Sequence, residues 1–407
     1  RSTICSQACC ICWAFLAGRK ADVPLSIGIL GGGQLGHYLC QEASRLGMET
    51  MVLTPDPDSP ATGSADRLVI GELDDVGAAA KLTAESDIVT FEIESIGAGV
   101  LSHLTDAEAK GDVRVAPGPG VLQLLQNKAQ QKAWLVHKGL PTLPFRVLPA
   151  SYPRPERLAR KFGLPLVQKA QQGGYDGRGV QIIRSEKDLL NFWPVPSIVE
   201  TYLPDTRELA VLVARGQDGS LLTYPAVSMV FDAVQNVLLE VTSPADISAG
   251  TAQRAEAIAT YAVERLGGVG LFAVEFFLTR EQTLYINEIS PRVHNAGHHT
   301  LEACPTSQFE QHLRAIAGLP LGPVTQTMPA VMRNLLGAPT ATGTEPEPGA
   351  DPASSAENVF VHWYGKREPR PGRKMGHITC VQNEPAKART LLQKTAASLA
   401  PKLAIAS

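Results

Sequence analysis

Apolar and polar positions alternate in two different ways along the chain, and the alternation predicts where strands and helices lie. A short apolar run at Leu25–Leu30 passes directly into the glycine-rich sequence Gly31–Gly36, after which apolar residues recur at helical spacing up to Gly47. This succession of an apolar run and a helical segment repeats downstream. It predicts strands at Glu49–Thr54, Arg67–Ile70, Asp87–Phe91 and Val113–Ala116, with a helix over Val76–Leu82. Such alternation is typical of a doubly wound α/β domain.

The rest of the chain is richer in strands. One long helix is expected over Leu122–Lys138, and apolar strands follow at Leu164–Lys169, Ser197–Leu203, Leu209–Ala214, Gly270–Leu278 and Leu284–Glu288. Beyond Pro323, the strand Ala330–Leu336 precedes a strand, a basic turn and another strand within Val359–Thr379. These patterns predict an α/β protein with a doubly wound domain at 23–125, a central domain at 126–320 and a small β-rich domain at 321–407.

Composition narrows the classes of function. The 407 residues carry 37 Lys and Arg against 40 Asp and Glu, which argues against a chain that mainly neutralises nucleic-acid phosphates or lies on an anionic membrane. No uninterrupted apolar run approaches the roughly 18 to 20 residues of a membrane-spanning helix. Cys40, Cys304 and Cys380 are scattered, which suits a reducing compartment. We predict a cytoplasmic, multidomain protein that handles small anionic metabolites.

Residues 1–22 follow no such pattern. An apolar run at Ala8–Ala17 is preceded by a charge only at Arg1 and is followed by Arg19 and Lys20. We expect a tail or a start-site artefact. The alternative is the remnant of a targeting peptide, which would imply import into an organelle.

The turn Gly31–Gly36 lies between a strand and a helix, where backbone N–H groups can bind an anion. Asp56 follows Gly36 by twenty residues, like the acidic residue of a dinucleotide-binding fingerprint. An NAD-dependent dehydrogenase is therefore one hypothesis, although many α/β folds need glycines here only for a tight turn and close packing. Glu92 and Glu94 end another strand, either at a ligand-binding edge of the sheet or as solvated carboxylates.

A second glycine-rich loop indicates a polyphosphate site. Lys169 ends a strand, and the ten residues 170–179 include four glycines. Their N–H groups can wrap phosphates while Lys169 supplies a positive charge. The loop is not of the Walker A type, because GxxxxGK[ST] is absent, and a flexible surface loop is the alternative.

Two acidic residues lie in strongly apolar strands. Glu275 is inside Gly270–Leu278, and Glu288 ends the next strand beside Asn287, with only a short turn between the two strands. We expect the two carboxylates to lie close together across a hairpin. Burying both without cations would be costly, and Mg²⁺ prefers oxygen ligands of this kind. The hairpin predicts a magnesium site, with Mn²⁺ as the alternative ion.

The segment after this hairpin adds candidates for anion binding and proton transfer. Arg292 and His294 suit a small oxyanion and a proton transfer beside a metal. A zinc site at His294, His298 and His299 is a weaker alternative, because no HExxH pattern is present.

The basic turn near the C-terminus carries Lys366, Arg373 and Lys374. Taken alone, it could be a solvated basic hairpin or a nucleic-acid patch. The near-neutral charge of the chain argues against nucleic acid, so a site for one phosphate monoester fits better.

Four segments together resemble one family. GGGQLG at 31–36, GGYDGRG at 173–179, NEISPRVHNAGH at 287–298 and HWYGKREPRPGRKMGH at 362–377 are similar, in this order, to the N5-carboxyaminoimidazole ribonucleotide synthetases of the ATP-grasp superfamily. The resemblance covers about residues 25–400. It implies a pre-ATP-grasp domain, a central ATP-grasp domain and a small C-terminal domain. One departure is Phe231, near which the family has a histidine that contacts the nucleotide.

The resemblance implies roles for the matching residues. The catalytic residues would be Arg292, which holds bicarbonate, His294, which handles a proton, Lys366, and Tyr175 with Asp176, which orient the amine. The ATP site would comprise Lys128, Lys169, Gly174, Tyr175, Asp176, Gly177, Arg178, Gly179, Glu200, Thr201, Tyr202, Leu203, Glu208, Asn287 and Glu288. Glu275 and Glu288 would hold magnesium. The ribonucleotide would contact Gly33, Gln34, Leu35, Glu92, Asn295, Lys366, Arg373 and Lys374.

The implied reaction is the ATP- and bicarbonate-dependent carboxylation of 5-aminoimidazole ribonucleotide through carboxyphosphate, in purine biosynthesis. The implied partners are these small molecules, with neither nucleic acid nor membrane, in a homodimer whose product passes to a separate mutase. Two alternatives remain: another ATP-grasp ligase or transformylase of the purine pathway, and the NAD-dependent dehydrogenase.

Overall fold

The computed structural model describes residues 24–152, 154–174, 179–232, 235–337, 357–367 and 369–403. Residues 1–22 and the loop residues Tyr175, Asp176, Gly177 and Arg178 lie outside these ranges, so what was predicted for them stays a prediction. In the part of the chain that is described, no helix combines the length and the apolar character needed to cross a membrane.

The N-terminal part is a parallel sheet with helices on both faces, as its strand–helix alternation predicts. The five strands lie in the order β3-β2-β1-β4-β5. Ile27 and Ile29 of the central strand pack with α2, whereas Leu30 packs with α3 and α4 on the other face. The strands are β1 (Ser26–Leu30), β2 (Glu49–Thr54), β3 (Arg67–Ile70), β4 (Ile88–Phe91) and β5 (Arg114–Val115), and the helices are α2 (Gln34–Arg45), α3 (Val76–Ala84) and α4 (Ala98–Lys110).

The single helix expected over Leu122–Lys138 is wrong, because the segment forms two helices. These are α5 (Pro119–Gln126) and α6 (Lys128–His137), and they are separated by Asn127 in an extended conformation. The Asn127 side chain accepts hydrogen bonds from the N–H groups of Ala129 and Gln130 at 2.9 and 3.1 Å. This cap fixes the start of α6, so that Lys128 is its first residue.

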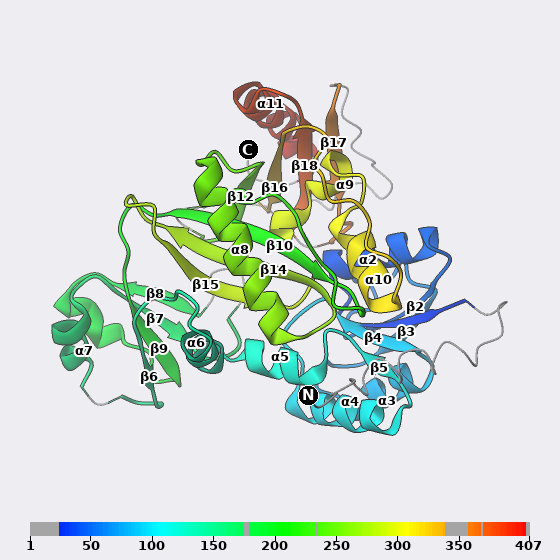
Figure 1. Ribbon diagram of the computed structural model, residues 1–407, viewed down its shortest axis with the longest axis horizontal. Helices are drawn as coiled ribbons and strands as arrows, with labels where there is room; N and C mark the ends of the chain where they lie inside the picture. The colour runs from blue at the N-terminus through cyan, green and yellow to red at the C-terminus, as the bar shows by residue number, and fades with distance from the viewer. Residues whose placement is uncertain are drawn as a thin grey trace, which may run out of the picture.

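A small antiparallel sheet follows, at the left of Figure 1. Its strand order is β6-β9-β7-β8, and α7 (Pro155–Phe162) packs against it. The apolar cluster between them includes Leu158, Leu166 and Val199. The strands are β6 (Phe145–Leu148), β7 (Leu166–Ala170), β8 (Val180–Ile183) and β9 (Ser197–Thr201), and η1 (Glu186–Asn191) is a short 3-10 helix beside them.

A nine-stranded sheet forms the centre of the molecule. Its main path is β15-β14-β10-β12-β13-β16-β18-β17, with β11 paired to β10. The strands are β10 (Arg207–Arg215), β11 (Leu221–Thr223), β12 (Val227–Phe231), β13 (Leu238–Ser243), β14 (Gly270–Leu278), β15 (Leu284–Ser290), β16 (Ala330–Leu336), β17 (Val359–Trp363) and β18 (Lys374–Val381). Because β13 pairs with β16, the sheet runs straight through the boundary predicted between residues 320 and 321.

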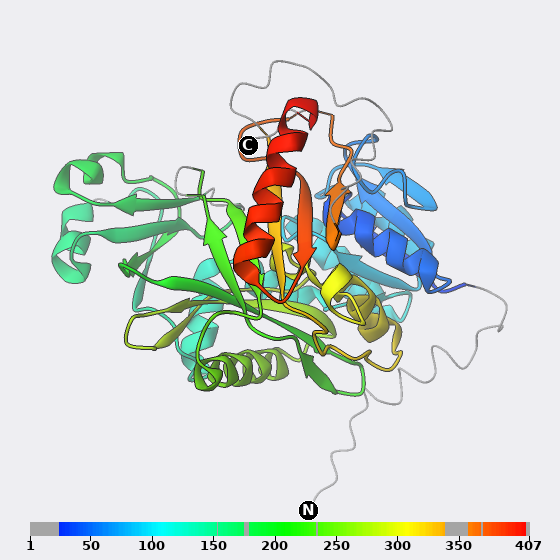
Figure 2. The same cartoon turned by 90° about the horizontal axis from the view of Figure 1, so that it is seen from above.

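Helices cover this long sheet at both ends. α8 (Ala249–Leu266) and α10 (Gln308–Ala317) pack on β10 and β14, and α11 (Pro385–Leu403) packs on β16 and β18, as Figure 2 shows. Two short helices, η2 (Asn295–Gly297) and α9 (Thr300–Ala303), follow β15.

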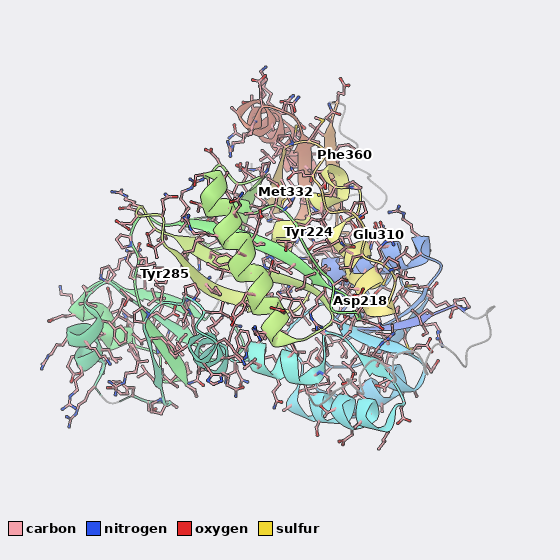
Figure 3. The ribbon with its side chains drawn as sticks, in the orientation of Figure 1. Asp218, Tyr224, Tyr285, Glu310, Met332 and Phe360 are labelled. Carbon is pink, nitrogen blue, oxygen red and sulfur yellow. The ribbon has the colours of Figure 1, made fainter. Side chains whose placement is uncertain are left out.

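One hydrophobic core joins all three parts of the chain. It contains Ile27 from β1, Tyr224 and Phe309 from the central part, and Tyr364 from the C-terminal part. Tyr224, labelled near the middle of Figure 3, is fully buried, and its hydroxyl donates to the carbonyl of Thr306 at 3.0 Å. The three predicted domains therefore pack against one another through a continuous apolar interior.

A buried histidine links the N-terminal sheet to the central sheet. The His312 Nδ1 atom accepts a hydrogen bond from the N–H of Leu271 at 3.0 Å, so its Nε2 atom carries the proton and donates to Thr90 Oγ1 at 2.8 Å. Burial lowers the pKa of His312 to about 4. Protonating Nδ1 would place two donors face to face, so this contact requires the neutral ring.

We expect this histidine to make folding sensitive to acid. The pKa of His312 is lower in the folded chain than in the unfolded chain, so its contribution is complete above about pH 6.5 and is lost as the pH falls toward 4. At pH 5 the linkage amounts to about 2 kcal/mol. In urea denaturation at pH 7.5 and 5.0, His312→Gln should show a smaller pH-dependent loss of unfolding free energy than wild type, whereas exposed His137→Gln should behave like wild type. Equal losses in all three proteins would contradict this assignment.

Candidate active site

A cleft of about 1390 Å³ opens between the N-terminal sheet, the small sheet and the central sheet. This volume exceeds the roughly 300 to 1,000 Å³ of a site for one drug-sized ligand, so two small molecules can fit together. The predicted site residues that line the cleft are Gly33, Gln34, Leu35, Glu92, Lys128, Lys169, Gly174, Glu200, Thr201, Tyr202, Leu203, Glu208, Glu275, Asn287, Glu288, Arg292, His294, Asn295, Lys366, Arg373 and Lys374. Gly179 instead lies at the base of its loop, where its carbonyl accepts from the N–H of Ala170 at 2.8 Å.

The two acidic strand residues lie directly opposite each other, as the hairpin predicts. Glu275 of β14 pairs in register with Glu288 of β15. The register then shifts, so that Phe276 pairs with Ile286 and Asn287 is an extra residue in β15. Neighbouring residues of a regular strand point to opposite faces, but this bulge allows Asn287 and Glu288 both to line the cleft.

The surroundings of these carboxylates differ in charge. Glu275 lies 3.3 Å from His294 Nε2 and accepts from Asn287 Nδ2 at 3.4 Å. Burial, together with the charges of Glu288 and Glu208, raises the pKa of Glu275. Glu288 forms an ion pair with Lys128, whose charge lowers the pKa of Glu288. One of the two facing carboxylates therefore lacks sufficient compensating positive charge, while the other has a lysine.

Three charged side chains form an ion-pair cluster beside this hairpin, two of them in the cleft wall and Lys132 behind it. Glu200 of β9 forms ion pairs with two lysines: Lys169 Nζ lies 2.7 Å from one of its oxygens, and Lys132 Nζ lies 2.6 Å from the other. Lys169 also donates to Asn287 Oδ1 at 2.9 Å. Although burial opposes it, the charges of Lys169 and Lys132 lower the pKa of Glu200 to about 2. The cluster therefore holds two cations and one anion.

Sequence reasoning missed Lys132. It lay inside a segment expected to be one long helix, with nothing in the hydrophobic pattern to separate it from a surface lysine. Its spacing of four residues from Lys128 was the available signal, because residues at i and i+4 share one helix face.

The first glycine turn binds an anion, but that anion is a side chain of the protein. Glu92 accepts from the N–H of Gly33 at 2.7 Å and from the N–H of Gly36 at 3.1 Å. Gly31 has φ +109°, and a Cβ atom on Gly33 would lie 2.6 Å from a Glu92 oxygen. Close approach of Glu92 therefore explains the glycines, and these two N–H groups already have an acceptor.

The dinucleotide hypothesis loses its main support for this reason. Glu92 occupies the N-terminus of α2, where a pyrophosphate would bind. Asp56 accepts from the N–H of Asp58 at 2.9 Å in an exposed turn and is not part of the cleft wall.

The second carboxylate of this strand end pairs with the predicted anion-binding arginine. Glu94 contacts Arg292 Nε at 2.8 Å, and Arg292 Nη1 donates to the carbonyl of Val293 at 3.0 Å. The side chains of Glu94 and Arg292 are partly exposed and line the cleft. Since Glu92 bonds to the glycine turn and Glu94 pairs with Arg292, neither is a free solvated carboxylate.

The zinc alternative finds no support in the described ranges, where no group of three or more His, Cys, Asp and Glu side chains could hold a metal ion. His294 Nδ1 accepts from the N–H of Ala296 and thereby caps η2. His298 and His299 are buried, and His299 Nδ1 bonds to the carbonyl of Ala296 at 3.0 Å.

The basic C-terminal hairpin reaches the first glycine turn. Lys366 Nζ donates to Gln34 Oε1 at 2.8 Å and to the carbonyl of Lys374 at 2.7 Å. Arg373 and Lys374 also line the cleft, as does Phe231. Lys366 of the C-terminal hairpin thus contacts the first glycine turn, and the two other basic residues of the hairpin belong to the same cleft.

Comparison with known proteins agrees with this architecture. Models of three domains match in succession: the ribonucleotide synthetase preATP-grasp domain at 25–126, the ATP-grasp domain at 133–309 and the phosphoribosylaminoimidazole carboxylase C-terminal domain at 330–390. The N5-carboxyaminoimidazole ribonucleotide synthase of Synechococcus elongatus is 39% identical over 358 residues, which cover 87% of this chain and 88% of that relative.

Solved structures of the same family have a similar fold. N5-carboxyaminoimidazole ribonucleotide synthetase from Thermotoga maritima has a TM-score of 0.81 at 38% identity and covers 92% of this chain and 98% of its own. The Aspergillus clavatus synthase in complex with ADP and 5-aminoimidazole ribonucleotide has a TM-score of 0.82 at 32% identity, with 91% and 97% covered. These matches confirm the predicted fold class and the resemblance carried by the four motifs. The chain belongs to the N5-carboxyaminoimidazole ribonucleotide synthase family of ATP-grasp ligases, which act in purine biosynthesis.

Proposed function

We propose that the protein uses ATP and bicarbonate to carboxylate the exocyclic amine of 5-aminoimidazole ribonucleotide, releasing ADP and phosphate. The observation that carries this proposal is one cleft lined by two separate sets of charged residues. Lys169 and Glu288 belong to the cluster at the β14–β15 hairpin, and Lys366 lies against Gln34 of the glycine turn, with Arg373 in the same cleft wall. A nucleoside triphosphate suits the first set and a phosphate monoester the second. The family to which the chain belongs supports both substrates.

ATP would lie between the small sheet and the central sheet. Lys128 and Lys169 would contact its phosphates, the segment 201–203 its adenine ring, and Glu208 its ribose. Burial raises the pKa of Glu208 to about 7, which suits a group that bonds to neutral hydroxyls. Phosphoryl transfer needs positioning and neutralisation of charge more than a protein nucleophile, and this end of the cleft offers both.

The donor set at the β14–β15 hairpin fits magnesium. Glu275 and Glu288 face each other, and burial, together with the charges of Glu288 and Glu208, raises the pKa of Glu275. A divalent cation between the two carboxylates would balance their negative charge. Glu275 and Glu288 would hold the ion, with the side-chain oxygen of Asn287 beside them. When bound, magnesium neutralises charge on the transferring phosphoryl group.

Bicarbonate would bind next to this hairpin. Arg292 can hold an oxyanion through its guanidinium, and His294 Nε2 already points at Glu275. ATP would phosphorylate bicarbonate, and the resulting carboxyphosphate would deliver its carboxyl group to the amine. Carboxyphosphate is short-lived in water, so the loop with Tyr175 and Asp176 would exclude solvent and orient the amine.

The ribonucleotide phosphate would lie among Lys366, Arg373 and Lys374, beside the turn that contains Gln34. Glu92 would act here by holding that turn, because it bonds to the N–H groups of Gly33 and Gly36. Asn295, which bonds to Asn334 at 2.6 Å, would line the middle of this site. A homodimer, a cytoplasmic location and a separate mutase for the product remain predictions.

Removing a carboxylate at the hairpin should stop turnover. We expect Glu288→Gln to lower ADP formation at least about a hundredfold, because it removes one of two anionic magnesium ligands and the partner of Lys128. ADP release would be measured with ATP, bicarbonate and the ribonucleotide over a magnesium titration. Glu281→Gln, on the exposed turn of the same hairpin, is the control and should behave like wild type. Near-normal turnover of Glu288→Gln at saturating magnesium would contradict the metal assignment.

The basic hairpin gives a test of the second substrate. Arg373→Ala should raise the KM for aminoimidazole ribonucleotide about ten- to a hundredfold, because a charge-assisted contact is worth roughly 1.5 to 3 kcal/mol. The KM for ATP should change little, and Arg373→Lys should recover only part of the loss. Arg367→Ala is the matched control, because Arg367 pairs with Asp58 outside the cleft. A shift in the ATP constant alone would assign this hairpin to the nucleotide instead.

A further inference from the structure

We infer that Lys132 is a positioning residue of the ATP site, which holds Glu200 so that Lys169 faces the phosphate-binding region of the cleft. This inference rests on the proposed function, because it assigns a task within ATP binding. Lys132 lies behind the cleft wall rather than in it, so it would act on the nucleotide through Glu200 and Lys169.

The start of α6 determines where this lysine reaches. Asn127 caps the helix, so that Lys128 is its first residue and Lys132 lies one turn later on the same face. Lys128 reaches Glu288 on the hairpin, while Lys132 reaches Glu200 on the small sheet. One helix face therefore connects the two sheets that enclose the nucleotide end of the cleft.

The ammonium of Lys132 is held by three polar contacts. Its Nζ atom lies 2.6 Å from Glu200 Oε1, 2.8 Å from Thr142 Oγ1 and 3.4 Å from the carbonyl of Ile286. The contacts with Thr142 and Ile286 are hydrogen bonds, and the contact with Glu200 is an ion pair. The Lys132 side chain is only 3% exposed, and such burial of a lysine is costly unless the charge has a specific partner.

The fixed carboxylate of Glu200 in turn determines where the ammonium of Lys169 lies. Its carboxylate is 1% exposed, and each of its oxygens faces one lysine. The oxygen that faces Lys169 is thereby fixed, and Lys169 extends to Asn287 at the edge of the magnesium site. Without Lys132, both Glu200 oxygens would be available to Lys169, which could then turn toward Glu200 and away from the phosphates.

The cluster also carries a surplus positive charge. Two ammonium groups share one carboxylate, and burial lowers the pKa of Lys132 to about 8 against the attraction of Glu200. The negative charge of the bound phosphates would balance the remaining positive charge of the two lysines. A Lys169–Glu200 pair without Lys132 would instead be neutral and would attract phosphate less strongly.

The test compares Lys132→Met with Lys138→Met, a lysine at the far end of the same helix. The dissociation constant of ATP would be measured by calorimetry, and KM and kcat by ADP release. We expect Lys132→Met to weaken ATP binding and raise the KM for ATP about ten- to a hundredfold, as for loss of a charge-assisted bond. The KM for the ribonucleotide should stay within about twofold, and Lys138→Met should match wild type. Equal ATP constants for the two variants, or equal shifts for both substrates, would overturn the inference.

A double-mutant cycle checks that Lys132 acts through Glu200. If it does, adding Lys132→Met to Glu200→Gln should change ATP binding much less than Lys132→Met changes it in wild type. Multiplied losses would instead mean an independent effect and overturn the inference. If Lys132→Met does not fold, Lys132→Gln retains N–H donors without the charge and should show the same selective loss for ATP. Failure of the proposed function would appear separately, as wild-type protein whose ADP release ignores bicarbonate and ribonucleotide.

Discussion

The structure of the cleft depends on the burial of facing carboxylates. Glu275 and Glu288 are neighbours across β14 and β15, and Glu208 adds a third negative group nearby. Like charges in a desolvated site repel, so cations must be supplied by the protein or by ligands. Lys128 pairs with Glu288, and Lys169 interacts with Asn287 between the two carboxylates. The lysines therefore balance part of the negative charge of the hairpin, and we propose that bound cations balance the rest.

At the first glycine turn the buried charge is positive, and a carboxylate of the protein balances it. A helix N-terminus has unsatisfied N–H groups and a partial positive charge, which an anion can satisfy. Here Glu92 supplies that anion from the neighbouring strand. Burial raises the pKa of Glu92, and the bonds from the N–H groups of Gly33 and Gly36 oppose that rise. A sequence pattern that fits dinucleotide binding therefore arises from a requirement for close packing against a carboxylate.

Periodicity was sufficient to predict most strands and the pairing of Glu275 with Glu288, because a short turn between two apolar strands leaves little choice of register. It could not predict the break at Asn127, since asparagine fits a helical pattern as well as a cap. The bulge at Asn287 and the burial of Lys132 depend on contacts between distant segments, which no local pattern records. Contacts between distant segments could thus be predicted only from the resemblance of the four motifs to a known family.

The charged cleft is joined to a buried aromatic interior, which holds one of the cleft's lysines in position. The rings of His362 and His377 stack at 4.3 Å with 11° between their planes, and Tyr364 Oη lies 2.8 Å from His377 Nδ1. Burial lowers the pKa of His377, so the ring of His377 is uncharged at neutral pH. Lys366 follows Tyr364 by two residues and leaves the interior for the cleft. Aromatic packing between the parts of the chain therefore fixes the position of Lys366, which we propose to contact a phosphate, because a flexible or hydrated contact there would leave that position undefined.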